Sequence, residues 1–285
     1  MSEEYKILTD FLDKLPSKNK YKDLKMIEAI ELNEVRNENC LDTMKLMPNN
    51  FVDLTVTSPP YDEMRTYNGY SFPFEDIAKE LYRVVKDGGV IVWIVGDATV
   101  NGSESGTSFR QALYFKEIGF NLHDTMIYRK ENPNPVMGSR YKQCFEYMFI
   151  LCKGKIKTFN PIKSECENTE GVVKCFIGEV DGIKQYVNKP RNKTKYIDNI
   201  FEYKTVRNKE TKQHPAVFPE MLANDHIISW SKEGDIIYDP FAGSGTTGKM
   251  AILNKRKCII SEISSEYCEI IKKRLEPIIN ERTIF

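Results

Sequence analysis

Histidine is rare in this sequence, and cysteine occurs only at scattered positions. The chain has three histidines and seven cysteines, and no two cysteines form a C-x-x-C pair. Zinc sites are typically built from closely spaced cysteines and histidines, and disulfide frameworks from an even set of cysteines. The sequence therefore predicts neither a metal site nor a disulfide framework. It favours the reduced thiols of a cytoplasmic protein.

Long hydrophobic runs are also missing. No apolar run approaches the ~18 residues that cross a bilayer. The first residues, MSEEYKILTD, lack the basic and then apolar pattern of a signal peptide. We therefore expect no membrane contact. Hydrophobic residues still make up 41% of the 285 residues, which is enough for a buried core and argues against a fibrous or disordered chain.

Net charge is zero for the whole chain but not for its parts. Between Arg129 and Lys209, 17 Lys and Arg residues stand against 9 Asp and Glu residues, and the rest of the chain carries the opposite excess. A local basic excess is typical of a region that contacts phosphates. A solvated, lysine-rich surface would give the same count, so charge alone leaves both interpretations open.

Hydrophobic periodicity predicts alternating strands and helices. We expect strands at 51–56, 90–95, 122–130, 145–154, 235–241 and 257–264, and helices at 74–85, 109–119, 218–228 and 246–255. This order is typical of an α/β protein with a doubly wound, mainly parallel sheet. The pattern fades at 155–212. We therefore divide the chain into an extension at 1–30, a main domain at 31–154 and 213–285, and an inserted basic region at 155–212.

A glycine-rich turn stands between the last two predicted strands. Gly243, Gly245 and Gly248 satisfy G-x-G-x-x-G, and Glu262 follows at the end of the next strand. Glycines let the backbone approach a ligand at a helix N-terminus, and an acid at this spacing can bind ribose hydroxyls. The P-loop pattern fails because Met250 stands where Ser or Thr is needed. The candidate ligands are NAD, in an oxidoreductase, and S-adenosylmethionine.

The first predicted strand of the main domain stops at Ser58-Pro59-Pro60-Tyr61. Two prolines fix the turn and remove N–H donors. The Ser58 hydroxyl and the Pro59 carbonyl can accept hydrogen bonds from the exocyclic amino group of a flipped-out base and aim its lone pair at a methyl donor. Tyr61 can stack on that base and offset part of the cost of extruding it. A simple loop cap would explain SPPY by itself, but it leaves the pairing with the glycine loop unexplained.

TSPPY at 57–61 and DPFAGSGTT at 239–247 together resemble the amino-group DNA methyltransferases of the permuted β class. The resemblance covers roughly residues 35–275. It implies a seven-stranded Rossmann-like sheet with a target-recognition region between the catalytic turn and the cofactor loop. It also implies S-adenosylmethionine as cofactor, double-stranded DNA as substrate and a role in restriction-modification. A cognate restriction endonuclease would be a natural partner, and the enzyme would be a monomer or a homodimer.

The resemblance assigns residues to the cofactor. HPAVFP at 214–219 resembles a segment that borders the cofactor pocket. Asn39-Cys40-Leu41 resembles an element near the cofactor adenine in which Asp is usual at the first position, so only Cys40 is carried over. The expected cofactor set is Cys40, His214, Pro215, Asp239, Pro240, Phe241, Ala242, Gly243, Ser244, Gly245, Thr246, Thr247 and Glu262.

A second set of residues is assigned to catalysis and DNA. The catalytic set is Ser58, Pro59, Pro60 and Tyr61. Arg65, Tyr67 and the 102–108 loop are expected to flank the target base. Arg140 and Lys142 lie in the basic segment between Arg129 and Lys209, which is expected to contact DNA.

Ser58 also bears on which base is methylated. In this family a serine at the first motif position is associated with N4 of cytosine and an aspartate with N6 of adenine. We therefore expect N4-cytosine, with N6-adenine as the alternative. C5 methylation needs a cysteine nucleophile, usually in a Pro-Cys pair, and none occurs here.

The sequence leaves three further classes of protein open. A nucleic-acid-binding protein could keep the pocket without catalysis, although the intact SPPY and FAGSGTT motifs argue against it. A methyltransferase could act on RNA or on a protein glutamine, but a glutamine-modifying relative would be expected to carry Asn in place of Ser58. An NAD-dependent oxidoreductase would use the glycine turn and leave SPPY and the basic segment unexplained.

Overall fold

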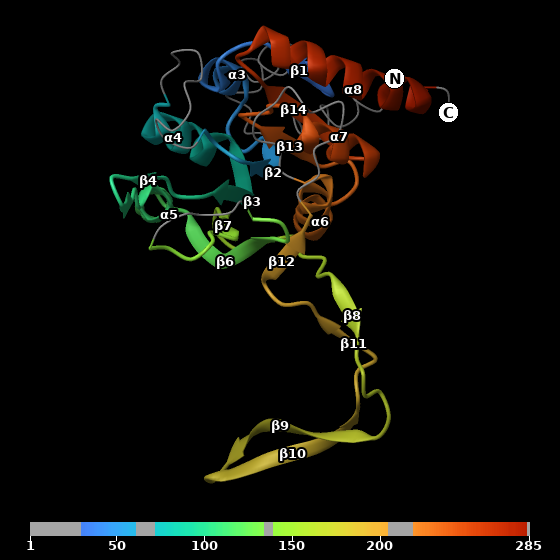
Figure 1. Cartoon of the computed structure of the whole chain (residues 1–285). Coiled ribbons are helices and arrows are strands. Elements are labelled where there is room, and N and C mark those ends of the chain that lie inside the picture. The colour runs from blue at the N-terminus through green and yellow to red at the C-terminus, as the bar shows by residue number, and fades with distance from the viewer. Residues whose placement is uncertain (1–29, 61–71, 134–138, 205–218, 284–285) are drawn as a thin grey trace. The chain divides into compact units, whose positions relative to one another are not determined.

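The computed structural model describes residues 30–60, 72–133, 139–204 and 219–283 (Figure 1). The chain divides into two compact units. Residues 161–198 form the smaller unit, and the remainder of the chain forms the larger one. Of the extension expected at 1–30, only Ile30 is among the described residues.

The larger unit is built on one mixed sheet. Its strands are β1 (Glu34–Arg36), β2 (Val52–Thr57), β3 (Val85–Val95), β6 (Asn121–Lys130), β7 (Phe145–Cys152), β12 (Ile200–Tyr203), β13 (Ile236–Asp239) and β14 (Lys257–Ser261). They pair in the order β1-β14-β13-β2-β3-β7-β6-β12. Only β7 runs antiparallel to its two neighbours, and every other pair is parallel. The sheet is therefore mainly parallel, as expected.

The described sheet has eight strands rather than the expected seven. Two strands lie outside the ranges predicted from periodicity: β1, and β12, which the sequence analysis assigned to the inserted region. β12 pairs in parallel with β6 at the edge of the sheet. Phe201 is its only buried side chain, so β12 shows no alternation of apolar and polar residues that periodicity could detect.

Helices cover both faces of this sheet, as a doubly wound fold requires (Figure 1). On one side lie α3 (Cys40–Leu46), α4 (Phe74–Val84) and α5 (Thr107–Glu117). On the other lie α6 (Glu220–Trp230) and α7 (Thr246–Leu253), and α8 (Ser265–Thr283) packs against α7. In the part of the chain that the structure describes, no helix is long and apolar enough to cross a membrane.

The core lies around β3, whose residues 90–95 are fully apolar because both faces of the strand are covered. Trp93 packs edge-on against Phe115 of α5 at a centroid distance of 5.1 Å, and Phe74 of α4 packs on Phe115 at 5.3 Å. The buried Trp93 Nε1 donates a hydrogen bond to Gln111 Oε1 at 2.8 Å. The central strand and the two helices on one face thus form a satisfied aromatic core.

The smaller unit consists of two ladders of two strands each. Strands β9 (Val172–Val180) and β10 (Ile183–Pro190) form an antiparallel hairpin, and β8 (Lys163–Glu165) pairs with β11 (Thr194–Tyr196). No residue of these four strands is buried. The sequence analysis found no alternation here because neither face of the ladders covers a core.

One buried histidine links strands β7 and β12 of the sheet to α6. His226 is fully buried, with its ring stacked on Phe201 of β12. Its Nδ1 accepts a hydrogen bond from Trp230 Nε1 at 3.2 Å, and its Nε2 lies 3.1 Å from Met148 Sδ of β7. Burial lowers the pKa of His226 to about 3, so the ring is neutral in the folded protein.

This histidine should make the fold sensitive to acid. Its pKa is lowered on folding, so below the unfolded value of about 6.5 the unfolded chain binds the extra proton and stability falls as pH falls. Between pH 7 and pH 5 the loss from His226 should be about 2 kcal/mol. Urea unfolding at both pH values should therefore show a smaller pH-dependent loss for His226→Gln than for the wild type. Equal losses in the two proteins would contradict this role.

Candidate active site

The two sequence motifs meet at the point where the sheet reverses its winding. Strand β2 leads through α4 to β3, and β13 leads through α7 to β14 on the opposite side. β2 and β13 are adjacent parallel strands, with Tyr238 opposite Thr55. Their carboxyl ends therefore lie together at the same edge. In open α/β sheets ligands bind in the crevice at such a switch point.

The SPPY turn, which the sequence analysis assigned to catalysis, begins where β2 ends. Ser58 and Pro60 are partly exposed, and Pro59 is buried. Because the two prolines lack N–H groups, β2 cannot continue past Thr57. Tyr61, Arg65 and Tyr67 lie outside the described residues.

A buried carboxylate connects this turn to the glycine loop. Asp239, at the end of β13, is 1% exposed. Its Oδ1 accepts hydrogen bonds from the Thr57 hydroxyl at 2.6 Å and from the Phe241 backbone N–H at 3.0 Å. Burial raises the pKa of Asp239 to about 6, and these two hydrogen bonds hold it from rising further. Thr247, at the start of α7, donates a second link at 3.0 Å, to the carbonyl of Val56.

The glycine loop has conformations and contacts that require glycine. Gly243 and Gly245 have φ values of 54° and 78°, which side chains rarely adopt. A Cβ at Gly245 would lie 2.9 Å from Ile271 of α8. From the same helix, Arg274 donates hydrogen bonds to the carbonyl of Ser244 and, at 2.7 Å, to Glu220 Oε1. The loop is thus held between α7 and α8.

Glu262 lies just after β14, where the sequence placed a ribose-binding acid. Its Oε2 accepts a hydrogen bond from the Gly243 N–H at 2.8 Å, and its Oε1 accepts one from the Ser264 N–H at 2.9 Å. Burial raises the pKa of Glu262, and the two N–H groups partly oppose that shift. Each carboxylate oxygen has a further lone pair, so the group can also accept a hydrogen bond from a ligand hydroxyl.

Cys40 is brought to the same edge of the sheet. It is the first residue of α3, and its carbonyl lies 3.3 Å from the hydroxyl of Tyr238, which donates to it. Nearby, the Asn37 side chain donates to the carbonyl of Glu262 at 3.0 Å. Burial raises the pKa of the Cys40 thiol to about 12, so it is protonated and unsuited to be a nucleophile.

Two of the expected DNA contacts are described. Arg140 donates a hydrogen bond to the carbonyl of Gly102, and it forms an ion pair with Glu104 at 3.5 Å. It therefore braces the short hairpin of β4 (Thr99–Val100) and β5 (Ser103–Glu104), which follows β3. Lys142 is exposed. His214 and Pro215, expected at the cofactor pocket, lie outside the described residues.

Two functional candidates were missed by the sequence analysis. Thr57 was quoted only as part of a motif, although it ties the two motifs together. Asp97 follows β3 and binds the start of α5, accepting hydrogen bonds from the N–H and hydroxyl of Ser108 and from the Ser105 hydroxyl at 3.1 Å. An acid directly after an apolar strand, followed by serines, was the signal that could have revealed Asp97.

The fold is therefore that of an α/β protein in which the SPPY turn after β2 lies beside the glycine loop after β13. Such a loop is typical of a site for a nucleotide-like ligand. The DNA methylase family matches residues 52–273, and the chain belongs to this family. It is therefore a DNA methyltransferase that acts on amino groups, with S-adenosylmethionine as its cofactor. The glycine loop and Glu262 suit that cofactor. Glu262 can accept hydrogen bonds from ribose hydroxyls, and S-adenosylmethionine has no phosphate that would need the lysine of a P-loop.

Individual relatives support the assignment. The chain is 56% identical over 236 residues to the orphan methyltransferase M.BamHII of Bacillus amyloliquefaciens, covering 79% of this chain and 89% of the relative. It is 28% identical over 241 residues to the DNA adenine methyltransferase YhdJ of Escherichia coli, covering 83% and 80%.

Solved structures share the fold. The cytosine-N4-specific PvuII DNA methyltransferase matches with a TM-score of 0.65 and 19% identity, covering 86% of this chain and 89% of that one. The complex of M1.HpyAVI with S-adenosylmethionine matches with a TM-score of 0.60 and 24% identity, covering 85% and 98%.

The Thr57–Asp239 hydrogen bond can be tested with a matched pair of threonines. Thr57→Val removes a donor from a buried carboxylate and should lower the free energy of unfolding by about 1–3 kcal/mol at pH 8. Thr55, in the same strand, is equally buried, and its hydroxyl has no hydrogen-bond partner among the described residues. Thr55→Val should therefore cost little or stabilise the protein.

Urea unfolding provides the comparison. Thr57→Ser keeps the hydroxyl and should recover much of the stability that Thr57→Val loses. The hydrogen bond lowers the pKa of Asp239, so its contribution is present above that pKa and should shrink as pH falls through about 6. Equal effects of the two valine variants at pH 8 would show that the bond does not hold the two strands together.

Proposed function

We propose that the protein methylates N4 of cytosine in double-stranded DNA, after flipping the base out of the duplex. The observation that carries the proposal is the junction at the switch point. The acceptor turn after β2 and the glycine loop after β13 leave adjacent strands, and Thr57 and Asp239 join them. This junction brings a base-binding turn next to a cofactor loop.

The chain's part in the reaction is positioning. S-adenosylmethionine supplies an electrophilic methyl group. The amino nitrogen of a base is a poor nucleophile because its lone pair is delocalised into the ring. We infer that the Ser58 hydroxyl and the Pro59 carbonyl accept hydrogen bonds from its two N–H groups and favour a pyramidal nitrogen. Tyr61 stacks on the extruded base, and the methylated nitrogen then loses its extra proton to solvent.

The cofactor role is proposed for the set named from the sequence, in two parts. Glu262 and the loop at 243–247 bind the cofactor directly, and Cys40, His214 and Pro215 border it. Asp239 is buried with its carboxyl turned to protein donors, so we assign it to holding the loop rather than to direct contact. Pro240, Phe241 and Ala242 connect Asp239 to the loop at 243–247.

The most specific part of the proposal is the identity of the methylated base. Ser58 favours N4 of cytosine, and N6 of adenine is the alternative. Both kinds of name occur among the similar proteins, since one is called cytosine-N4-specific and another an adenine methyltransferase.

The biological setting completes the proposal. We place the enzyme in the cytoplasm, in restriction-modification, as a monomer or homodimer that can act with a cognate endonuclease. The catalytic turn at 57–61 precedes residues 161–198, which precede the loop at 243–248, and this is the motif order of the permuted β class. Target recognition is assigned to the region around the smaller unit, with Arg65, Tyr67, Arg140 and Lys142 as DNA contacts.

The product identifies the reaction. Purified protein is incubated with mixed-sequence DNA and S-adenosylmethionine, and the DNA is digested to nucleosides for mass spectrometry. We expect N4-methylcytosine. N6-methyladenine would keep the mechanism and replace the base. No methylated nucleoside, from protein that binds the cofactor and has met varied DNA, would contradict the proposal.

Two substitutions in the turn test the mechanism. Ser58→Ala should lower methyl transfer by about 100-fold or more, the scale seen when a positioned hydrogen-bonding group is lost from an active site. Tyr61→Ala should lower it by about 10- to 100-fold, because stacking of a base on an aromatic ring is worth about 1–3 kcal/mol. Calorimetric titration with S-adenosylmethionine should give wild-type affinity for both, because neither residue is assigned to the cofactor. Full activity of Tyr61→Ala would rule out the stacking role.

A further inference from the structure

Positive charge in the smaller unit is concentrated in its second half, where the chain returns from the tip of the hairpin to the larger unit. Residues 161–198 contain seven Lys and Arg residues and six Asp and Glu residues, which nearly balance. The outgoing half, 161–181, holds two of the cations and five of the acids. The returning half, 182–197, holds five cations and no acid. The excess of positive charge therefore lies on the returning half alone.

Three of the seven cations have a neighbour in the unit that explains them. Lys174 Nζ lies over the Tyr186 ring at 4.8 Å, and Lys163 Nζ lies over the Tyr196 ring at 5.9 Å. Lys184 stands directly across the hairpin from Glu179. Cation–π contacts and opposite charges across a ladder stabilise two-stranded sheets. These three lysines can thus serve the fold of the unit itself.

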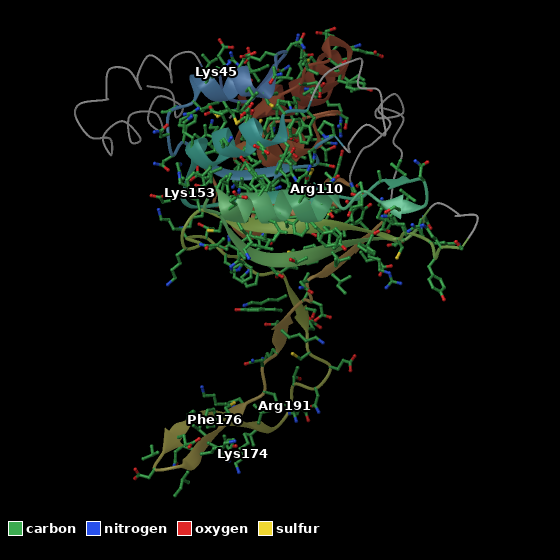
Figure 2. The ribbon with its side chains drawn as sticks, turned by 90° about the vertical axis from the view of Figure 1, so that its left-hand side faces the viewer. Lys45, Arg110, Lys153, Lys174, Phe176 and Arg191 are labelled. Carbon is green, nitrogen blue, oxygen red and sulfur yellow. The ribbon has the colours of Figure 1, made fainter. Side chains whose placement is uncertain are left out.

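The other four cations have no such neighbour. Lys189, Arg191, Lys193 and Lys195 are all exposed, and none forms an ion pair or a cation–π contact with any described residue. They occupy every second position of the returning chain (Arg191 is labelled in Figure 2). Lys189 lies in β10 and Lys195 in β11, and Arg191 and Lys193 lie in the connection between these two strands. The four cations therefore follow one another along one exposed segment.

The outgoing strand offers these cations no negative charge at the opposite positions. Val173 is paired with Lys189, and Ser164 with Lys195. Backbone hydrogen bonds place Gly171 opposite Arg191 and Cys166 opposite Lys193. Like charges at this spacing repel each other, and no carboxylate stands directly opposite any of the four cations. A row of cations along an exposed segment is therefore complementary to a regular polyanion.

We propose that Lys189, Arg191, Lys193 and Lys195 form a phosphate-contacting row that binds the backbone of double-stranded DNA without reading its sequence. The inference rests on the proposed function, which makes duplex DNA the substrate. Phosphate contacts fix the position of a protein on the duplex, whereas sequence is read at the base edges. The row is thus a positioning element, and the three partnered lysines are excluded from it.

Salt dependence separates this row from the general charge of the unit. The row variant carries Lys189→Gln, Lys193→Gln and Lys195→Gln. The matched control carries Lys163→Gln, Lys174→Gln and Lys184→Gln, which remove the same charge from the same unit. Binding of the full-length proteins to a mixed-sequence duplex is measured from low to moderate salt. The slope of log affinity against log salt should weaken by about 2.7 in the row variant, at about 0.9 per lost phosphate contact, and by less than about 1 in the control.

The outcomes are distinct. Three results would each overturn the inference. They are a salt slope of the row variant equal to that of the wild type, an equal change of slope in the control variant, and no binding of the wild type to duplex DNA. If a triple variant does not fold, Arg191→Gln alone should weaken the slope by about 0.9. Nucleoside analysis runs in parallel. Methylation with unchanged slopes would remove the row and keep the proposed function, whereas the slope difference without methylation would keep the row and remove that function.

Discussion

The hydrogen bond between the Thr57 hydroxyl and the Asp239 carboxylate is the constraint on which the site depends. It joins the ends of two parallel strands whose residues are 182 positions apart in the chain. A buried carboxylate that lacked this donor would carry a large desolvation cost, so the two strand ends are held at a fixed separation. The SPPY turn and the glycine loop start from these two ends, so this contact, with the pairing of β2 and β13 and the Thr247–Val56 hydrogen bond, sets their relative placement.

The glycine loop is also fixed from its other side. Glu262 holds the N–H of Gly243, and Arg274 of α8 holds the carbonyl of Ser244. Both partners are nearly buried and act on the backbone, which leaves the ligand-facing side of the loop available. The proposed mechanism works by positioning, without a general acid, a general base or a metal, and such a mechanism requires this kind of rigidity. On that proposal the buried polar groups serve catalysis as well as the fold.

Local pattern in the sequence was sufficient for the central strands, the glycine loop and Glu262, because each has a short-range signal: an apolar run, required positive φ values, or a fixed spacing. It was insufficient for Thr57, since the neighbour of residue 57 is decided by the order of strands in the sheet. β12 was missed for a related reason, as an edge strand with one buried residue has no periodicity. The basic segment was visible in composition, but its concentration on residues 182–197 became meaningful only once strand pairing showed which lysines have partners.

The two units place opposite physical demands on their residues. Methyl transfer to a weakly nucleophilic nitrogen tolerates only small errors in position, so the groups proposed for it are few and are held by buried hydrogen bonds such as that of Thr57 with Asp239. Attraction to a phosphate backbone acts over about a Debye length, roughly 10 Å at 0.1 M salt, so exposed and individually mobile cations are adequate. Substitutions in the turn at 57–61 should therefore act on turnover with little dependence on salt. Substitutions of the four cations at 189–195 should lower DNA affinity in proportion to the charge removed. Turnover and DNA affinity can therefore be altered separately in one chain.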